Sequence, residues 1–427
     1  MHACYRAIVW LLTAAILSPA QAQLRGHGGP VRALALTADG GELVSGSFDA
    51  TAIIWSLGRG NAEQVLRFHL GALNAVAALP DGRIATSGED GRIAIWGRGE
   101  REPGQVLLGH GGPVVALAVS PDGKTLASAS WDNTARLWPL AGGPPRVLEG
   151  HRQNVNGVTF TADGGSVVTV GYDASLRIWP LEAAAAARIV SLSSPLNAVV
   201  AGKGGKLIAA GASGKVFFLS AAGDVEAELN AATAPLIALA ISGDGKRLAA
   251  SSIQGAIAVI DPEARTLERT LVGPGLPAWA VVFLADSRSL LTGGGDRVIR
   301  RWNSETGEQA GEVAIGGPDD PLAAYQADPG AQVFRACVAC HTLRAQDGPR
   351  AGPSLAGIFG RKIATLPGYD YSPALKGLDI VWTPETLSKL FELGPAAYTP
   401  GSKMPEQRVG AQDRLDLIAF LGKATKN

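Results

Sequence analysis

The most chemically distinctive residues of this chain are two cysteines and a histidine near its C-terminal end. Residues 334–343 read FRACVACHTL, so Cys337, Cys340 and His341 form the pattern CxxCH. Two thiols at this spacing on one helical turn can add to the two vinyl groups of a haem, and the adjacent imidazole can face the iron. The pattern therefore predicts one covalently bound haem c, attached through Cys337 and Cys340, with His341 as an iron ligand.

Two other uses of paired thiols fit the sequence less well. A thioredoxin-like dithiol would need a βαβ pattern around the motif, and none surrounds it. A zinc site would need more ligands, but the C-terminal region has no further cysteine and no histidine besides His341. Haem is therefore the cofactor that we expect.

The second iron ligand follows from the small number of candidates. The chain has two methionines, Met1 and Met404, and Met1 belongs to a segment that we expect to be removed. Met404 lies in the stretch PGSKMP (400–405), a polar setting that is unusual for a core methionine. A thioether ligand raises the potential of the iron relative to a second imidazole. We predict His341 and Met404 as the metal ligands; the alternative is a packing methionine beside an open iron site.

The N-terminal residues have the composition of an export signal. Arg6 is followed by an apolar run from Ala7 to Leu17, and residues 20–22 read AQA, a small-residue cleavage site. The apolar run is too short to span a bilayer. We expect residues 1–22 to be cleaved, with Cys4 among them, and the protein to reach the bacterial periplasm without stable membrane insertion. An uncleaved membrane anchor is the alternative.

The overall charge does not favour a nucleic acid as partner. Lysine plus arginine equal aspartate plus glutamate, at 38 each, so the chain offers no net positive charge to a phosphate backbone. Its 427 residues exceed one ordinary domain, and 46% are apolar, enough for real cores. We therefore expect a multidomain chain whose partners are proteins.

A repeat organises the residues that precede the CxxCH region. Segments ending in a bulky residue recur every 40 to 42 residues, at Trp55, Trp96, Trp138, Trp179, Leu219, Ile260 and Trp302. Most units also contain an Asp-Gly turn between short β-rich runs. Four strands in each of seven units is the arrangement of a β-propeller. The sequence predicts an all-β, seven-bladed propeller over residues 23–316.

These units resemble the WD40 family. The resemblance rests on the dipeptides Gly26-His27, Gly109-His110 and Gly150-His151, and on an aspartate six residues before the terminal tryptophan: Asp49, Asp90, Asp132, Asp173 and Asp296. It implies a buried network of Asp, His, Ser or Thr, and Trp in each such blade. His69 stands in the same position without a preceding glycine. Ser213 and Gln254 replace the aspartate in units five and six, which we expect to be less rigid.

The repeat alone does not fix how the ring closes or what the propeller does. The family closes its ring with an N-terminal strand, whereas here GEVAI (311–315) could supply that strand from the C-terminal side. No catalytic motif stands out in the blades, so we interpret the blade histidines as core hydrogen-bonding groups. The propeller is then a docking platform for proteins.

The pattern becomes helical after the stretch GGPDDP (316–321). We expect a linker at 317–327 and an all-α domain at 328–427, with helix starts at Asp328-Pro329 and Thr383-Pro384. This domain resembles class I cytochromes c of the mitochondrial and c2 type. The stretches that carry the resemblance are VFRACVACHTL, GPSLAGIFGRK, LPGYDYSPALKG, VWTPETL, YTPGSKMP and LIAFLGKATKN.

The resemblance implies roles for residues around the cofactor. Pro353 accepts a hydrogen bond from the outer nitrogen of His341. Three side chains lie near the haem propionates: Arg361, Tyr371 and Trp382. The first and last helices meet through Gly330, Phe334 and Phe420. Some positions depart from the family, since Ala396 and Ala397 stand where lysines are common and Phe391 where a tyrosine is usual, so the propeller is expected to take over partner recognition.

These observations lead us to expect an exported c-type cytochrome that transfers single electrons and is not an enzyme. Redox partner proteins would dock on the propeller or at the haem edge. One alternative is a periplasmic oxidoreductase whose propeller binds a catalytic cofactor and passes electrons to the cytochrome. Another is a scaffold or sensor in which the redox state of the haem controls partner binding.

Overall fold

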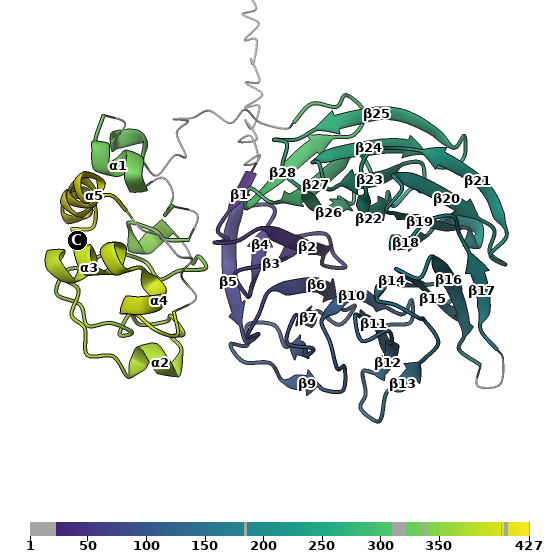
Figure 1. Cartoon of the computed structure of the whole chain (residues 1–427), viewed down its shortest axis with the longest axis horizontal. Helices are drawn as coiled ribbons and strands as arrows, with labels where there is room; N and C mark the ends of the chain where they lie inside the picture. The colour runs from purple at the N-terminus through teal and green to yellow at the C-terminus, as the bar shows by residue number, and fades with distance from the viewer. Residues whose placement is uncertain are drawn as a thin grey trace, which may run out of the picture.

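The protein contains a ring of β-sheets and a smaller helical part beside it (Figure 1). The computed structural model describes residues 23–182, 186–309, 322–325, 327–334, 337–338, 340–347, 349–402, 404 and 409–426. The predicted signal (1–22), the GEVAI segment and most of the predicted linker lie outside these residues.

The ring consists of seven antiparallel sheets of four strands each, so the predicted seven-bladed propeller is confirmed. Blade 1 contains β2 (Val31–Leu36), β3 (Glu42–Ser47), β4 (Thr51–Ser56) and β5 (Asn61–Arg67), and blade 2 contains β6 (Leu73–Ala78), β7 (Ile84–Gly88), β8 (Ile93–Trp96) and β9 (Gln105–Leu107). Blade 3 contains β10 (Val114–Val119), β11 (Thr125–Ser130), β12 (Ala135–Pro139) and β13 (Arg146–Leu148), and blade 4 contains β14 (Val155–Phe160), β15 (Ser166–Gly171), β16 (Ser175–Pro180) and β17 (Arg188–Ser191). Blade 5 contains β18 (Leu196–Ala201), β19 (Leu207–Gly211), β20 (Lys215–Leu219) and β21 (Val225–Asn230), and blade 6 contains β22 (Leu236–Ile241), β23 (Leu248–Ser252), β24 (Ala256–Asp261) and β25 (Thr266–Val272).

Blade 7 closes the ring with a strand from the other end of the propeller sequence. It combines β26 (Ala278–Phe283), β27 (Ser289–Gly294) and β28 (Val298–Asn303) with β1 (Gln23–Arg25). β1 runs antiparallel to β28, with Gln23 opposite Arg300 and Arg25 opposite Val298. The N-terminal strand therefore occupies the outer position of the last blade, which the sequence had left open.

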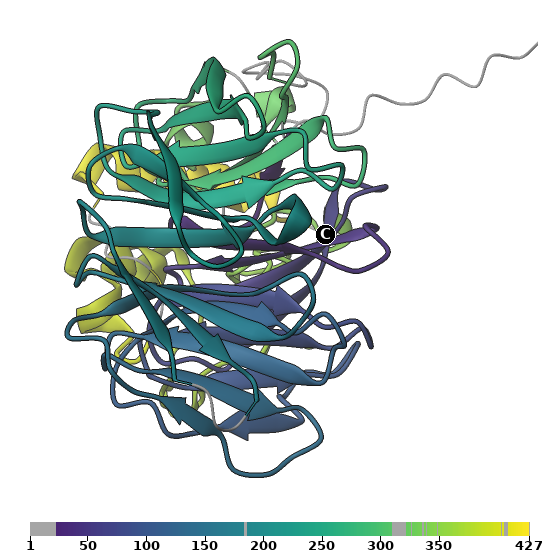
Figure 2. The same cartoon turned by 90° about the vertical axis from the view of Figure 1, so that its right-hand side faces the viewer.

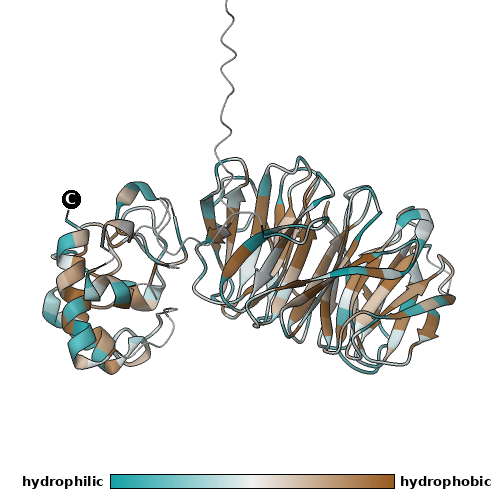
Figure 3. Ribbon diagram, turned by 90° about the horizontal axis from the view of Figure 1, so that it is seen from above, coloured by the Kyte–Doolittle hydropathy of each residue, from teal (hydrophilic) through white to brown (hydrophobic). Residues whose placement is uncertain are grey.

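The blades are held together by apolar side chains between neighbouring sheets. The innermost strands β2, β6, β10, β14, β18, β22 and β26 each contact the next one around the ring. Because side chains alternate between the two faces of a strand, each sheet supplies apolar groups to both neighbours. Val44 of blade 1, for example, shares a buried cluster with Val76 of blade 2. Figure 3 shows the apolar residues following the strands, and Figure 2 shows the propeller from its side.

A buried polar network stiffens individual blades. In blade 3 the Nδ1 atom of His110 lies 2.8 Å from Oδ2 of Asp132, and its Nε2 atom lies 2.7 Å from Oγ of Ser128. The indole of Trp138 donates a hydrogen bond to the same Ser128 Oγ at 2.8 Å. Each polar group within this network thus has a partner, as buried polar groups require.

The same network recurs in three other blades. It links His27, Asp49, Ser45 and Trp55 in blade 1, His69, Asp90, Thr86 and Trp96 in blade 2, and His151, Asp173, Thr169 and Trp179 in blade 4. His69 therefore takes part although no glycine precedes it. In blade 7 the bond from Trp302 to Thr292 remains, at 2.9 Å, while Asp296 pairs with Arg300.

The helical part is assembled from short helices around one core. Its helices are α1 (Pro329–Phe334), α2 (Pro373–Lys376), α3 (Pro384–Leu393), α4 (Pro395–Tyr398) and α5 (Ala411–Ala424), with 3₁₀ turns η2 (Ala323–Tyr325) and η3 (Ala345–Asp347); a further turn, η1 (Lys203–Gly205), belongs to blade 5. Thr383 caps α3, since its hydroxyl accepts a hydrogen bond from the Thr386 amide at 3.2 Å. The predicted start at Thr383-Pro384 is therefore present.

The first and last helices pack closely, as the cytochrome resemblance implies. The rings of Phe334 in α1 and Phe420 in α5 lie 5.5 Å apart between centroids. A Cβ atom on Gly330 would lie only 2.0 Å from the carbonyl oxygen of Asp416. Tyr325, which falls within the segment predicted as a linker, also packs on Phe420 at 5.2 Å. The packing of the helical part therefore begins before residue 328.

Candidate cofactor site

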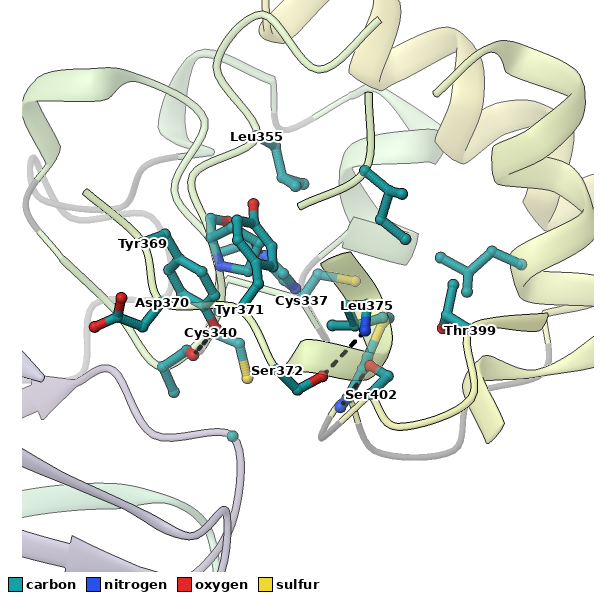
Figure 4. A pocket seen from close by; sticks show the side chains of 18 of the residues that line it. Cys337, Cys340, Leu355, Tyr369, Asp370, Tyr371, Ser372, Leu375, Thr399 and Ser402 are labelled. Atoms are coloured by element: carbon teal, nitrogen blue, oxygen red, sulfur yellow. Dashed lines mark hydrogen bonds between the residues drawn. The ribbon is translucent and has the colours of Figure 1, made fainter. Parts of the chain in front are cut away.

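A cavity of about 420 Å³ lies among the helices of the C-terminal part (Figure 4). All eight residues that the sequence analysis assigned to the cofactor line it: Cys337, Cys340, His341, Pro353, Arg361, Tyr371, Trp382 and Met404. They come from five separate stretches of the chain, which the fold brings together around one cavity. We call this cavity the haem crevice.

The CxxCH residues form a tight turn directly after α1. The amide of Cys337 donates to the carbonyl of Phe334 at 2.7 Å, and the amides of Cys340 and His341 donate to the carbonyl of Cys337 at 3.1 and 2.9 Å. Burial raises the pKa of the Cys337 thiol to about 11 and that of Cys340 to about 12. The thiolate forms needed for disulfide exchange are therefore disfavoured here.

The imidazole of His341 has one fixed orientation. Its Nδ1 atom lies 2.7 Å from the carbonyl oxygen of Pro353, the bond that the cytochrome resemblance implies. A carbonyl can only accept, so Nδ1 carries the proton and Nε2 keeps its lone pair for a metal. Burial also lowers the pKa of His341, which favours the neutral ring that metal ligation requires.

Gly352 is a site residue that the sequence analysis missed. A Cβ atom at this position would lie 2.5 Å from Cε1 of His341 and 2.9 Å from the carbonyl oxygen of Cys340. Its amide donates to that same carbonyl at 2.8 Å. The glycine thus lets the backbone pass against the face of the imidazole, and its place beside Pro353 in AGPSL was the one available signal.

Met404 lines the haem crevice from the segment between α4 and α5. Its amide donates to Oγ of Ser402 at 3.1 Å, and its side chain packs against the apolar core of the helical part. Ser372, which caps α2, donates its hydroxyl to the carbonyl of Gly401 at 3.1 Å and ties this loop to α2. The loop that carries Met404 is therefore fastened on its N-terminal side.

Arg361 and Trp382 brace one wall of the haem crevice. The guanidinium of Arg361 donates to the carbonyls of Ser354 and Ala356 at 2.8 and 2.9 Å. The amide of Trp382 donates to the carbonyl of Arg361 at 2.9 Å, and the amide of Gly360 donates to the carbonyl of Trp382 at 2.8 Å. These bonds hold Arg361 against the segment that follows Pro353.

The lining of the haem crevice matches the chemistry of haem c. Apolar side chains of Leu355, Ile358, Leu387 and Leu390 suit a porphyrin ring. Arg361 and Tyr371 also line the crevice and offer donors for carboxylates. Two thiols, an oriented imidazole and a thioether complete the set. The residues present therefore fit a covalently bound haem.

Residues of the propeller also line this cavity, which the sequence analysis did not anticipate. They include Gly28, Asp49, Arg67 and Leu70. No local sequence pattern predicts these residues, because the contact between Arg67 and Ala351 joins positions 284 residues apart. The crevice is thus bounded by both parts of the chain.

Comparison with known proteins assigns both parts. The family described as "WD domain, G-beta repeat" matches residues 19–56, 60–97, 101–139, 142–180 and 265–303, and "Cytochrome c" matches 327–425. Curated relatives include the cytochrome c of Cochliobolus lunatus, 43% identical over 99 residues, 23% of this chain and 91% of the relative. That of Arabidopsis thaliana is 43% identical over 99 residues, covering 23% of this chain and 88% of the relative. Cytochrome c type-1 of Ascaris suum is 39% identical over 111 residues, covering 26% and 96%.

Among the described residues, no helix combines the length and the apolar character needed to cross a membrane. The match at 327–425 covers nearly the whole length of the relatives, and the propeller precedes it in the same chain. Haem c is covalently bound in this family, and electron transfer through that haem is its role. The chain therefore belongs to the cytochrome c family through its C-terminal domain, which follows a propeller of WD40 repeats.

Proposed function

We propose that this protein is an exported, periplasmic electron carrier in which His341 and Met404 ligate the iron of one haem c and the propeller docks a redox partner. The observation that carries the proposal is the convergence of Cys337, Cys340, His341 and Met404 on one cavity. The export signal predicted at residues 1–22 supports the location.

Each residue of the haem crevice has a defined task in this proposal. Cys337 and Cys340 tether the cofactor, which supplies the one-electron chemistry when bound. Pro353 holds the proton on Nδ1 of His341, so that Nε2 faces the iron. Met404 adds a soft ligand that favours the reduced state. Because His341 and Met404 would both stay bound to the group in either oxidation state, no bond would have to form or break when an electron is transferred.

The propeller offers an exposed apolar surface suited to a protein partner. Phe48, Trp131, Tyr172 and Ile253 are 41%, 47%, 50% and 40% exposed, and we call them the platform residues. Each directly precedes the position of the network aspartate in its blade, so all four lie at the same end of the ring. Exposed aromatic residues are enriched at protein interfaces. The platform is therefore the surface on which we place the partner.

The cofactor and the location can be tested on the whole protein. The full chain would be expressed with haem-attachment machinery, fractionated, and examined by visible spectroscopy and intact-mass measurement. A periplasmic, coloured protein that begins at Gln23 and carries the mass of one haem supports the proposal. A colourless product, or a haem protein retained in the cytoplasm, contradicts it.

The platform can be tested by partner capture with a matched variant. The Trp131→Ala/Tyr172→Ala double variant removes two platform residues but leaves the buried network of each blade intact. Removal of interface aromatics costs up to several kcal/mol of binding energy, so we expect at least roughly tenfold weaker binding of a captured redox protein. Unchanged binding would exclude the platform as the docking surface.

A further inference from the structure

The haem crevice opens against the propeller rather than into solvent on its Cys340 side. In Figure 4 the sulfur of Cys340 points towards the pale purple ribbon, which is the N-terminal part of the propeller. Gly28 and Asp49 of the propeller line the same cavity as Cys340. This makes the contact between the two domains part of the cofactor site.

Arg67, the last residue of β5, makes most of the described polar contacts across this boundary. Its Nη2 atom donates to the carbonyl oxygens of Arg350 and Ala351, at 2.8 and 3.0 Å. Its guanidinium carbon lies 4.2 Å from the centre of the Tyr369 ring, a cation–π distance. The Tyr369 hydroxyl donates to the same Ala351 carbonyl at 2.7 Å. A single arginine thus engages two backbone carbonyls and one aromatic ring of the cytochrome domain.

A backbone bond reinforces the contact beside Arg67. The amide of Ala351 donates to the carbonyl oxygen of Gly26 at 3.1 Å. The cytochrome segment that receives these contacts continues directly into Gly352 and Pro353. The propeller therefore binds the backbone at residues 350–351. The next two residues, Gly352 and Pro353, contact and orient His341.

Gly28 marks how closely the two domains approach. A Cβ atom at this position would lie 2.6 Å from Sγ of Cys340, while its nearest neighbours within the propeller would lie 3.8 Å away. The corresponding positions after the histidines of blades 2 and 4 hold Leu70 and Arg152, so the blade itself accepts a side chain there. It is the cytochrome domain that leaves no room at residue 28.

We propose that the propeller forms the outer wall of the haem crevice on the Cys340 side, with Arg67 as the residue that holds the two domains together. Protein-sized redox partners reach this side of the crevice only when the contact opens, whereas small reductants do not need it to open. This consequence rests on the electron-carrier function proposed above; the contact itself does not.

The exchange of the Ala351 amide hydrogen with deuterium measures the contact directly, because its acceptor belongs to the propeller. The haem-loaded full chain would be compared with Arg67→Ala and Gly28→Ala. Loss of two hydrogen bonds and a cation–π contact, or insertion of a Cβ against Cys340, should speed this exchange at least about tenfold. Amides of β3 and α3 should stay protected in both variants, as each domain remains folded.

Two controls match these substitutions. Arg98→Ala removes an arginine whose described partner, Glu42 at 2.8 Å, lies within the propeller. Gly111→Ala repeats the glycine change at the equivalent position of blade 3, where the nearest atom, Cβ of Asp132, is 4.0 Å away. Both controls should exchange the Ala351 amide at the wild-type rate. An unprotected Ala351 amide in the wild type, or equal rates in all five proteins, would overturn the proposal.

Electron transfer from reductants of two sizes tests whether the propeller covers the crevice. Reduced plant-type ferredoxin, a protein, should reduce Arg67→Ala and Gly28→Ala faster than wild type by the same factor as the amide exchange. Ascorbate should reduce Arg98→Ala and Gly111→Ala at the wild-type rate, and Arg67→Ala and Gly28→Ala should gain less with ascorbate than with ferredoxin. Equal ferredoxin rates would overturn the claim that the propeller covers the crevice. Loss of the haem signal altogether would instead contradict the proposed function, while the amide measurement would remain interpretable.

Discussion

The Nδ1 atom of His341 lies 2.7 Å from the carbonyl oxygen of Pro353, and this bond decides which nitrogen can meet a metal. The backbone reaches that position because Gly352 has no side chain to strike the imidazole. The orientation of the His341 ring therefore depends on the Pro353 carbonyl and on the absence of a side chain at Gly352.

Substitution of Gly352 should disturb the axial ligand. In Gly352→Ala the added methyl would meet the imidazole of His341 at 2.5 Å, so ring and backbone must move apart. We expect a loss of about 1–3 kcal/mol in unfolding free energy, typical of overpacking, and a changed haem spectrum. Thermal unfolding followed at the haem absorbance measures both. Gly377→Ala is the control, since its nearest contact is an ordinary 3.5 Å; similar behaviour of the two variants would contradict the role of Gly352.

Replacement of Met404 should lower the reduction potential. Met404→Ala removes the thioether that favours reduced iron, and the low-spin spectrum should be lost with it. Met404→His should restore a low-spin spectrum. Its reduction potential should stay below that of the wild type, because an imidazole ligand stabilises oxidised iron more strongly than a thioether does. Spectroelectrochemical titration distinguishes these outcomes. A wild-type potential in Met404→Ala would show that another group ligates the iron.

The contact between α1 and α5 should be sensitive to a single methyl group. In Gly330→Ala the Cβ would lie 2.0 Å from the Asp416 carbonyl and 2.5 Å from Cβ of Phe420, which forces the helices apart. We expect the cytochrome domain to lose about 1–3 kcal/mol or more of stability. Gly422→Ala, also at α5, meets nothing nearer than 4.0 Å and should be neutral or stabilising. Chemical denaturation monitored by haem absorbance measures both stabilities. Equal stabilities of Gly330→Ala and Gly422→Ala would contradict the tight contact between α1 and α5.

The propeller should lose stability in acid. Burial alone would raise the pKa of Asp132 and Asp173, but hydrogen bonds outweigh it and lower both to about 2, below the ordinary 3.8. Stability from these carboxylates is therefore complete above about pH 3.8 and lost as the pH falls towards 2. Because both carboxyls keep some contact with solvent, we expect about 1–2 kcal/mol from each.

The histidines of the same networks add an earlier step. Burial lowers the pKa of His110 and His151 from the ordinary 6.5, so the unfolded chain binds protons more readily below that pH. Stability should then begin to decline below about pH 6.5 and fall again below pH 3.8. The melting temperature of the sheets, followed by circular dichroism from pH 7 to 2, measures this. Asp132→Asn should weaken the lower step, and a melting temperature that rises in acid would contradict the assignment.

The periodic features of the protein were predictable from its sequence. The spacing of 40 to 42 residues between the bulky unit ends gives the seven blades, because each blade repeats the same local packing. His69 shows the limit of dipeptide matching: it bonds to Asp90 at 3.0 Å although it lacks the preceding glycine. Cys337, Cys340, His341 and Met404 could be named because their chemistry is rare in this chain. The other four cofactor residues were named only through the resemblance to cytochromes c.

The non-local features were not predictable in this way. The strand β1 is only three residues long, too short for a periodic pattern, so the sequence could not decide between it and GEVAI as the partner of β28. Arg67 looks like any charged residue at the end of a strand, and its engagement of Ala351 depends on how two domains meet. Neither propensity nor spacing within one segment carries that information.

The pairing of β1 with β28 has a consequence for how the molecule is assembled. The first strand to emerge during synthesis must wait, unpaired, until nearly 300 further residues have been made. During that interval the ring is an open arc whose two end blades expose apolar sheet faces, the kind of surface through which chains associate. Only after Val298–Asn303 has formed can the arc become a circle, and the haem-bearing domain follows last.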